Sequence, residues 1–116
     1  MRPGEGVEVL LHREPVDFRK QINGLAVLVE QELGLSPFGE RLYAFTNRRR
    51  DRIKLLYWDR TGFALWMKRL EKERFPWPEA GEETLTLTGR ELGWLLDGID
   101  WFRIRPHERV FFETVL

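Results

Sequence analysis

The chain has 116 residues, of which 42% are hydrophobic and 33% are charged, so we expect one globular domain over residues 1–116. It contains no cysteine, which excludes disulfides, thiolate chemistry and cysteine-based zinc sites. No apolar run approaches the roughly 20 residues that cross a bilayer, and residues 1–6 lack the apolar core of a signal peptide. We therefore expect a cytoplasmic protein that does not contact membranes.

The formal net charge is zero, but the charge is unevenly distributed along the chain. Residues 41–75 carry eleven basic and four acidic side chains, whereas the segments on either side are acidic. Two interpretations are open. Either the acidic flanks fold over the basic middle and neutralise it, or the basic middle forms a surface for an anionic partner.

The first third of the chain predicts a strand followed by a helix. Apolar residues alternate with Glu8 over residues 7–11, which favours a short strand. Asp17 is then suited to be a helix N-cap, and Gly34 is suited to end that helix. The apolar residues between them recur at helical spacing: Phe18, Ile22, Leu25, Ala26, Val29 and Leu33.

The middle of the chain predicts a β-hairpin. Residues 42–45 and 53–58 are rich in apolar, β-favouring side chains, and Asn47 and Asp51 in the polar segment between them suit turn geometry. Five basic residues fall within residues 48–54, at the tip of this hairpin. Because like charges repel, such a cluster indicates an anionic partner, with nucleic acid as the first candidate.

Residues 63–70 follow a turn signal at residues 59–62 and fit two patterns. Phe63, Trp66, Met67 and Leu70 have helical spacing, while Phe63, Leu65 and Met67 alternate as in a third strand of a meander. We favour the helix, because residues 68–74 are strong helix formers, and keep the strand as the alternative.

The last third of the chain begins with two chain-breaking prolines, Pro76 and Pro78, and an acidic segment, residues 79–83. Residues 84–87 alternate as a strand, and Thr88 and Glu91 form a capping box that opens a helix ending near Gly98. Residues 110–116 are a further β-like run. The pattern predicts an α+β domain, with a mostly antiparallel sheet of four to six short strands and two or three helices packed on one face.

The candidate nucleic-acid-binding residues are the basic side chains of the hairpin tip and of the segment that follows the second turn. They are Arg48, Arg49, Arg50, Arg52, Lys54, Lys68, Arg69, Lys72 and Arg74. Trp77 beside this cluster is the best candidate for an exposed aromatic, although a ring packed against the hairpin is the interpretation that we prefer.

No catalytic or metal-binding constellation is visible. His12 and His107 lie far apart without metal-ligand spacing, and the one serine, Ser36, stands before a proline. Asp51 and Asp59 have simpler roles in turns than as metal ligands. We therefore predict a protein that is not an enzyme and has no metal or cofactor.

Several segments together resemble one known family. Residues 17–25 fit a D-[MF]-R-K-x-x-x-G-L signature, residues 47–59 fit R-R-x-D-x-[IL]-K-[VL]-L-[YW]-[WH]-D, and residues 68–78 and 92–100 fit its continuation. Over about residues 7–101 the chain is similar to the small accessory proteins, often called TnpB, of the insertion-sequence-66 family of bacterial transposable elements. Residues 102–116 match no motif of that family.

The resemblance implies an accessory protein for transposition, which works beside a separate transposase that carries the catalytic carboxylates. It supplies no catalytic residue. Two hypotheses follow: the basic hairpin binds DNA at or near the element's ends, or the protein docks on the transposase or another element-encoded protein, or on itself, without contacting DNA.

Overall fold

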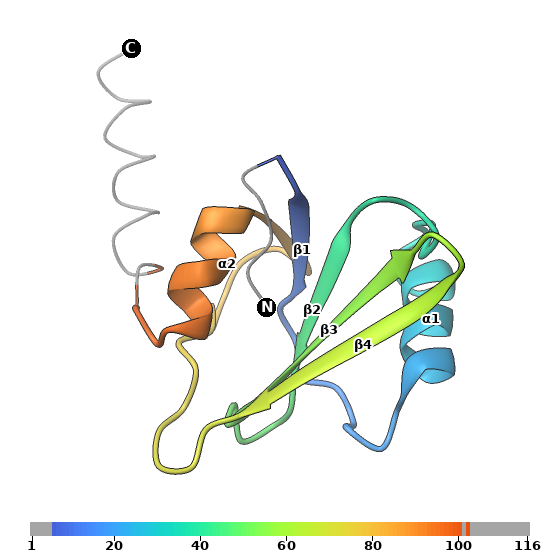
Figure 1. Cartoon of the computed structure of the whole chain (residues 1–116). Helices are drawn as coiled ribbons and strands as arrows, with labels where there is room; N and C mark the ends of the chain where they lie inside the picture. Colours follow the sequence, from blue (N-terminus) through green and yellow to red (C-terminus); the bar gives the residue numbers. More distant parts are fainter. Residues whose placement is uncertain (1–5, 101, 103–116) are drawn as a thin grey trace.

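The computed structural model describes residues 6–100 and residue 102, which form a five-stranded mixed sheet with a helix on each face (Figure 1). The order along the chain is β1 (Glu8–His12), α1 (Ile22–Gln31), β2 (Leu42–Thr46), β3 (Arg52–Asp59), β4 (Gly62–Arg69), β5 (Thr84–Thr88) and α2 (Gly89–Leu96). Across the sheet the order is β4-β3-β2-β1-β5.

The connections explain this strand order. β1 and β2 are parallel, with Val9 opposite Leu42, and parallel neighbours need a long crossover, which α1 supplies. β2, β3 and β4 follow as antiparallel hairpins, and β5 returns to pair antiparallel with the other side of β1. The sheet is therefore mostly antiparallel, as predicted, with one parallel pair at its centre.

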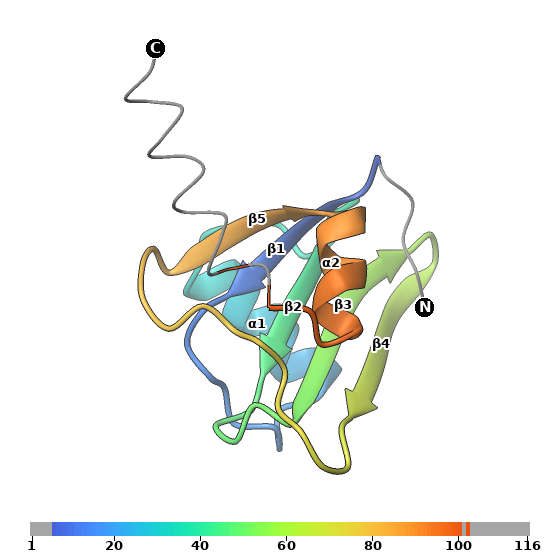
Figure 2. The same ribbon diagram turned by 90° about the vertical axis from the view of Figure 1, so that its left-hand side faces the viewer.

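The two helices cover opposite faces of the sheet, as Figures 1 and 2 show. On one face Leu10, Tyr43, Phe45 and Leu56 pack with Leu25, Leu28 and Val29 of α1. On the other face Val9, Leu11, Ala44 and Leu55 pack with Leu92, Leu95 and Leu96 of α2.

This arrangement confirms the α+β class and the number of strands and helices within the described residues, but the prediction that the helices share one face is wrong. The reason lies in β2, which is buried at every position. A strand of this kind needs cover on both faces of the sheet, so the helices divide between the two faces.

The prediction of a helix over residues 63–70 is wrong, and the alternative strand is confirmed. β4 pairs with β3 without interruption from Asp59 opposite Gly62 to Arg52 opposite Arg69. Residues 60 and 61 form the two-residue turn between β3 and β4, in which Arg60 has φ +54°. Long-range pairing with β3 overrides the helical propensity of the segment, and the strong helix formers lie at the end of the strand and in the loop beyond it.

Helix α1 begins five residues after the predicted N-cap. Asp17 instead shapes a turn, in which its Oδ1 accepts the backbone N–H of Arg19 at 2.9 Å and its carbonyl accepts that of Lys20 at 3.0 Å. The N-cap is Gln21, whose side chain makes no capping hydrogen bond. At the other end the chain leaves the helix through Gly34 with φ +65°, as predicted.

The local signals around α2 are confirmed. The Oγ1 of Thr88 accepts the Glu91 backbone N–H at 3.1 Å, and the Glu91 carboxylate accepts that of Thr88 at 2.9 Å. Gly98 follows the helix with φ +81°. The β-like run at residues 110–116 lies outside the described residues.

Candidate nucleic-acid interface

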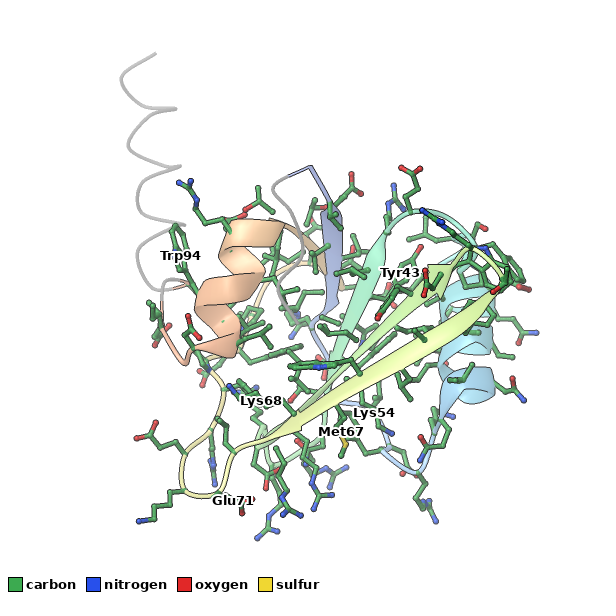
Figure 3. All side chains as sticks on the ribbon, in the orientation of Figure 1. Tyr43, Lys54, Met67, Lys68, Glu71 and Trp94 are labelled. Carbon is green, nitrogen blue, oxygen red and sulfur yellow. The ribbon has the colours of Figure 1, made fainter. Side chains whose placement is uncertain are left out.

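Two loops meet at one end of the sheet, the lower end in Figure 1. One is the tip of the β2–β3 hairpin and the other is the segment that follows β4. Two backbone hydrogen bonds join them, from the N–H of Leu70 to the carbonyl of Asp51 at 2.8 Å and from the N–H of Phe75 to the carbonyl of Arg50 at 2.7 Å. Nitrogen-tipped side chains gather at this end around Glu71 (Figure 3).

We call this surface the basic end. It comprises the basic residues that the two loops and the adjoining strand ends carry: Arg48, Arg49, Arg50, Arg52, Arg69, Lys72 and Arg74.

Asn47 and Asp51 hold the hairpin tip, as the sequence predicted. The side-chain oxygen of Asn47 accepts the backbone N–H of Arg52 at 3.1 Å, and its amide nitrogen donates to Asp51 Oδ1 at 2.6 Å. This last hydrogen bond lowers the pKa of the Asp51 carboxyl, which favours its ionised form. The chain turns through Arg50 with φ +60°, and Arg48 and Arg49 are exposed.

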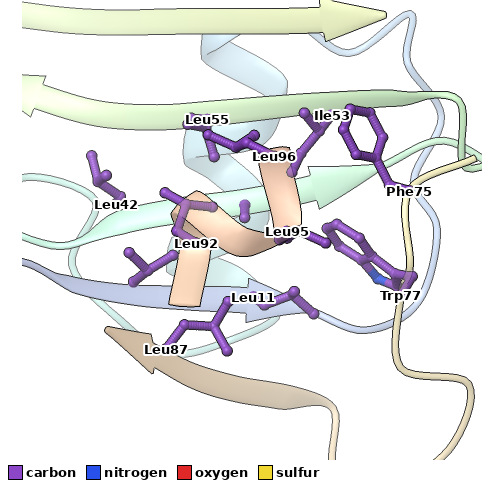
Figure 4. Close-up of a cluster of buried hydrophobic side chains, with 12 residues drawn as sticks. Leu11, Leu42, Ile53, Leu55, Phe75, Trp77, Leu87, Leu92, Leu95 and Leu96 are labelled. Carbon is purple, nitrogen blue, oxygen red and sulfur yellow. The ribbon is translucent and has the colours of Figure 1, made fainter. Parts of the chain in front are cut away.

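Two buried aromatic side chains anchor the second loop. Phe75 and Trp77 pack beside Ile53 and Leu95 under α2 (Figure 4), and the indole N–H of Trp77 donates to the carbonyl of Arg13 at 2.9 Å. Trp77 is 5% exposed, so its ring is packed in the core and is not a surface aromatic. This agrees with the packed ring that we preferred from the sequence. Lys72 and Arg74 precede this anchor and are exposed.

Acidic residues neutralise the basic end in part. Glu79 Oε1 lies 3.4 Å from Nη1 of Arg50, and Glu71 Oε1 lies 3.1 Å from Nη2 of Arg69. Glu82 and Glu83 instead direct their carbonyl oxygens to Arg13.

The remaining charge of this surface is uncovered. Arg48, Arg49, Lys72 and Arg74 make no ion pair with any residue that the structure describes. Of the two interpretations of the basic middle of the chain, neither holds in full: the acidic residues neutralise part of the basic surface and leave part of it open.

Lys54 is not brought to the basic end. It is 3% exposed on the face of β3 that α1 covers, and its Nζ donates to the carbonyls of Phe18 at 2.9 Å and Lys20 at 2.8 Å. Nζ also lies 4.6 Å from the centroid of the Phe18 ring. Burial lowers the pKa of Lys54, and the nearby positive charge of Arg52 lowers it further. In this position the ammonium group ties the loop before α1 to the sheet.

Lys68 also has an internal role. Its side chain lies on the opposite face and donates from Nζ to the carbonyl of Leu96 at 2.9 Å, at the C-terminal end of α2. A helix C-terminus carries unsatisfied carbonyls and a partial negative charge, both of which a lysine ammonium satisfies. Figure 3 shows Lys68 directed toward α2 and away from the sheet edge.

The loop before α1 adds two basic residues beside the basic end that were not among the predicted binding residues. The backbone N–H of Val16 bonds the carbonyl of Thr46 at 2.9 Å, so this loop lies against the hairpin. Arg19 and Lys20 in it are exposed, but Arg19 is paired with Asp17 at 2.6 Å. That interaction lowers the pKa of Asp17 to about 2. The sequence feature that could have identified Arg19 and Lys20 as basic residues near the site is the Asp-Phe-Arg-Lys run that contains them.

Over residues 6–100 and residue 102, no three histidine, cysteine, aspartate or glutamate side chains come together in a way that could hold a metal ion. His12 is buried, with Nδ1 at 2.8 Å from the carbonyl of Glu14, while His107 lies outside the described residues. These residues also include no helix with the length and apolar character needed to cross a membrane. The arrangement at the basic end presents positive charge on a braced pair of loops, which is the chemistry of phosphate binding.

Comparison with known proteins places this chain in a family. A family model described as IS66 Orf2 like protein matches residues 7–106, so it ends six residues beyond the last motif recognised in the sequence, residues 92–100. Two proteins of Sinorhizobium fredii (strain NBRC 101917 / NGR234) are similar to the chain. Uncharacterized protein y4jC is 34% identical over 103 residues, covering 89% of this chain and 88% of that protein.

Uncharacterized protein y4hO is 34% identical over 98 residues, covering 84% of this chain and 85% of that protein. No solved structure matches. The family match confirms the resemblance that the motifs at residues 17–25, 47–59, 68–78 and 92–100 indicated. The chain belongs to the IS66 Orf2-like family, and this membership indicates an accessory protein of transposition.

Proposed function

We propose that this protein assists transposition of a bacterial insertion sequence by binding DNA through the basic end. The observation that supports the proposal is the state of Arg48, Arg49, Lys72 and Arg74. They are exposed, they lack ion pairs among the described residues, and they stand on two loops that backbone hydrogen bonds hold together. Arginine and lysine in such a setting bind phosphate oxygens.

The mode of binding follows from which elements carry these residues. α1 and α2 cover the faces of the sheet, so loops rather than a helix present the basic end to a duplex. Contacts from loop arginines and lysines to phosphates position a protein on DNA but carry little sequence information. We therefore propose that affinity comes mainly from the phosphate backbone and that it depends strongly on salt concentration.

A titration at several salt concentrations tests this proposal. Fluorescence anisotropy with a labelled duplex from the element's end should show binding at low salt, with log Kd changing by about 0.9 per neutralised phosphate for each unit of log salt. The double variant Arg48→Ala/Arg49→Ala should bind more weakly and lower that slope by about 2. The control is Arg60→Asn, which removes one positive charge at the other end of β3 and suits the positive φ of that turn.

Two results would overturn the proposal: no binding by the wild-type protein at low salt, or a double variant that binds with the same affinity and slope as the Arg60→Asn control.

Docking on the transposase is the second candidate, and one observation favours it. The acidic partners of Arg50 and Arg69, together with the internal roles of Lys54 and Lys68, leave the basic end with less free charge than the sequence suggested. A surface of mixed charge suits a protein partner as well as DNA. Co-purification with the transposase that withstands nuclease digestion, and that Arg48→Ala/Arg49→Ala abolishes, would favour this candidate.

A further inference from the structure

β4 is an edge strand whose outer side has no partner strand among the described residues. In an antiparallel ladder, alternate residues direct their backbone N–H and C=O groups to opposite sides of the strand. The hydrogen bond from the N–H of Leu70 to Asp51 shows that the even-numbered residues of this segment bond toward β3. The N–H and C=O groups of Phe63, Leu65, Met67 and Arg69 therefore point to the open edge.

Apart from Lys68 and Arg69 at its C-terminal end, this edge lacks the features that usually protect one. β4 is eight residues long, contains no proline, and pairs with β3 in continuous register, without a bulge. Its first six residues, 62–67, are uncharged, and its apolar side chains are partly or largely exposed. The opposite edge strand, β5, is five residues long and alternates threonine with leucine. A long, regular, apolar edge is a template for pairing with another strand.

We propose that β4 pairs antiparallel with β4 of a second copy of this chain, about a two-fold axis at Trp66. Hydrogen-bonded pairs across the new edge must join outward-directed residues of both strands, so the axis has to pass through a residue and not between two. With the axis at Trp66, Leu65 pairs with Met67 of the second copy, and Phe63 pairs with Arg69 of the second copy.

The charges on β4 favour a second copy in this antiparallel arrangement. The strand ends in two cations, Lys68 and Arg69, and has no acidic residue. Antiparallel pairing about Trp66 sets Lys68 opposite Ala64 and Arg69 opposite Phe63, so no like charges face each other across the pair. It also sets the two Trp66 side chains directly opposite, and aromatic cross-strand pairs of this kind stabilise a sheet.

The shape of the surface beside β4 fits the same register. Met67 is 53% exposed on the face that α1 covers, and a shallow groove on that face is lined by Leu65 and by residues 19–24, which are the end of the loop before α1 and the first turn of the helix. Because Met67 of the second copy stands next to Leu65 in the pairing, its side chain enters this groove. Two exposed methionines and two open grooves are covered together, which a strand of unrelated sequence would not achieve.

The pairing has one geometric consequence. The basic end lies at the C-terminal end of β4, and antiparallel strands run in opposite directions. The dimer would therefore be a continuous ten-stranded sheet with its two basic ends pointing away from each other.

Disulfide trapping tests both the partner and the register, because the wild-type chain has no cysteine. At a non-hydrogen-bonded antiparallel pair the Cα atoms are about 4.5 Å apart, within the range that a disulfide spans. Under oxidation, Trp66→Cys should give a covalent dimer as the main product, while Leu65→Cys, which faces Met67 of the second copy, should form little covalent dimer. The reverse result, or no covalent dimer from either variant, would overturn the proposed pairing.

A second pair of variants tests the edge without cysteine. Met67→Pro removes one outward N–H and leaves the ladder with β3 intact, whereas Met67→Val retains that N–H. In sedimentation velocity runs over a range of concentrations, wild type and Met67→Val should dimerise and Met67→Pro should be a monomer with wild-type circular dichroism. Dimers of Met67→Pro would place the interface elsewhere. A wild-type monomer at every concentration would show that no second copy occupies the edge, and either result would refute the proposal.

Discussion

Lys54 places its ammonium nitrogen 2.9 Å from the carbonyl oxygen of Phe18 and 4.6 Å from the centroid of the same residue's ring. One side chain from β3 thus holds both the backbone and the aromatic ring of the loop before α1. Lys54 and Phe18 belong to two separate motifs of the family resemblance, at residues 47–59 and 17–25. Their contact indicates that these motifs specify the joint between the crossover helix and the sheet.

The first prediction concerns the free energy of unfolding. Replacing Lys54 with methionine leaves the carbonyls of Phe18 and Lys20 without their donor, and a lost hydrogen-bond partner in a partly buried site costs about 1–3 kcal/mol. Urea unfolding should show a decrease of that size for Lys54→Met. Arg48→Met, which removes an exposed charge, should change the value by less than about 0.5 kcal/mol.

The same two variants should behave in the opposite way toward DNA. Folded Lys54→Met should retain the wild-type affinity, while Arg48→Met should bind more weakly. A Lys54→Met protein that unfolds like wild type but loses DNA affinity would show that Lys54 contacts the ligand.

The second prediction concerns acid stability. The guanidinium of Arg19 lowers the pKa of Asp17 from 3.8 to about 2 in the folded protein. Between these values the unfolded chain binds more protons than the folded one at this site, so stability falls as pH falls. The contribution of Asp17 is fully present above the unfolded pKa of 3.8 and is lost as the pH falls through about 2.

Asp17→Asn keeps the oxygen that shapes the turn but removes the charge, so its urea midpoint should lie below that of wild type at pH 6 and approach it at pH 2. Asp59→Asn, an exposed change of the same charge at the other end of the sheet, is the control. A gap between wild type and Asp17→Asn that stays constant from pH 6 to pH 2 would contradict the role of the Asp17–Arg19 pair.

The third prediction concerns the anchor of the second loop. Trp77→Phe keeps an aromatic ring in the core but removes the indole N–H that bonds to Arg13, so it should lower the free energy of unfolding by about 1–2 kcal/mol. Trp58→Phe, at a partly buried site on β3 and outside the proposed β4 interface, is a control for the change in ring size. Hydrogen exchange should show faster exchange of the Phe75 amide in Trp77→Phe. An unchanged rate would mean that the anchor does not depend on the indole hydrogen bond.

The parts of the fold that the sequence predicted are those set by neighbouring residues. Asn47 and Asp51 in the hairpin tip, the Thr88–Glu91 capping box and Gly98 each act within a few positions of themselves, so their chemistry can be read locally. The segment at residues 63–70 was ambiguous because its apolar residues satisfy both periods. Pairing with β3, which no local pattern reveals, decided it.

In the candidate site, too, the sequence predicted what neighbouring residues determine and missed what long-range packing determines. Arg48 and Lys54 look alike in the sequence, as basic residues six positions apart in one run. The alternation of strand faces turns Lys54 toward α1, and the hairpin tip turns Arg48 toward solvent. The capture of Lys68 by the carbonyl of Leu96 depends on where α2 packs, 28 residues later in the chain. Burial of a charged side chain is a property of the tertiary structure. The sequence could therefore locate the basic cluster but could not tell which of its residues are exposed and which are buried.

The last prediction combines the two proposals of DNA binding and strand pairing. Because the dimer directs its basic ends away from each other, each dimer should hold two separate duplexes instead of clamping one. Energy transfer between a donor-labelled and an acceptor-labelled duplex should therefore rise when wild-type protein is added at low salt. Met67→Pro should bind each duplex, as anisotropy reports, without raising the transfer, whereas Arg48→Ala/Arg49→Ala should reduce both signals. Energy transfer with Met67→Pro equal to that of wild type would show that bridging does not need the β4 edge, and normal anisotropy without transfer in the wild-type protein would show that the two basic ends act on one duplex.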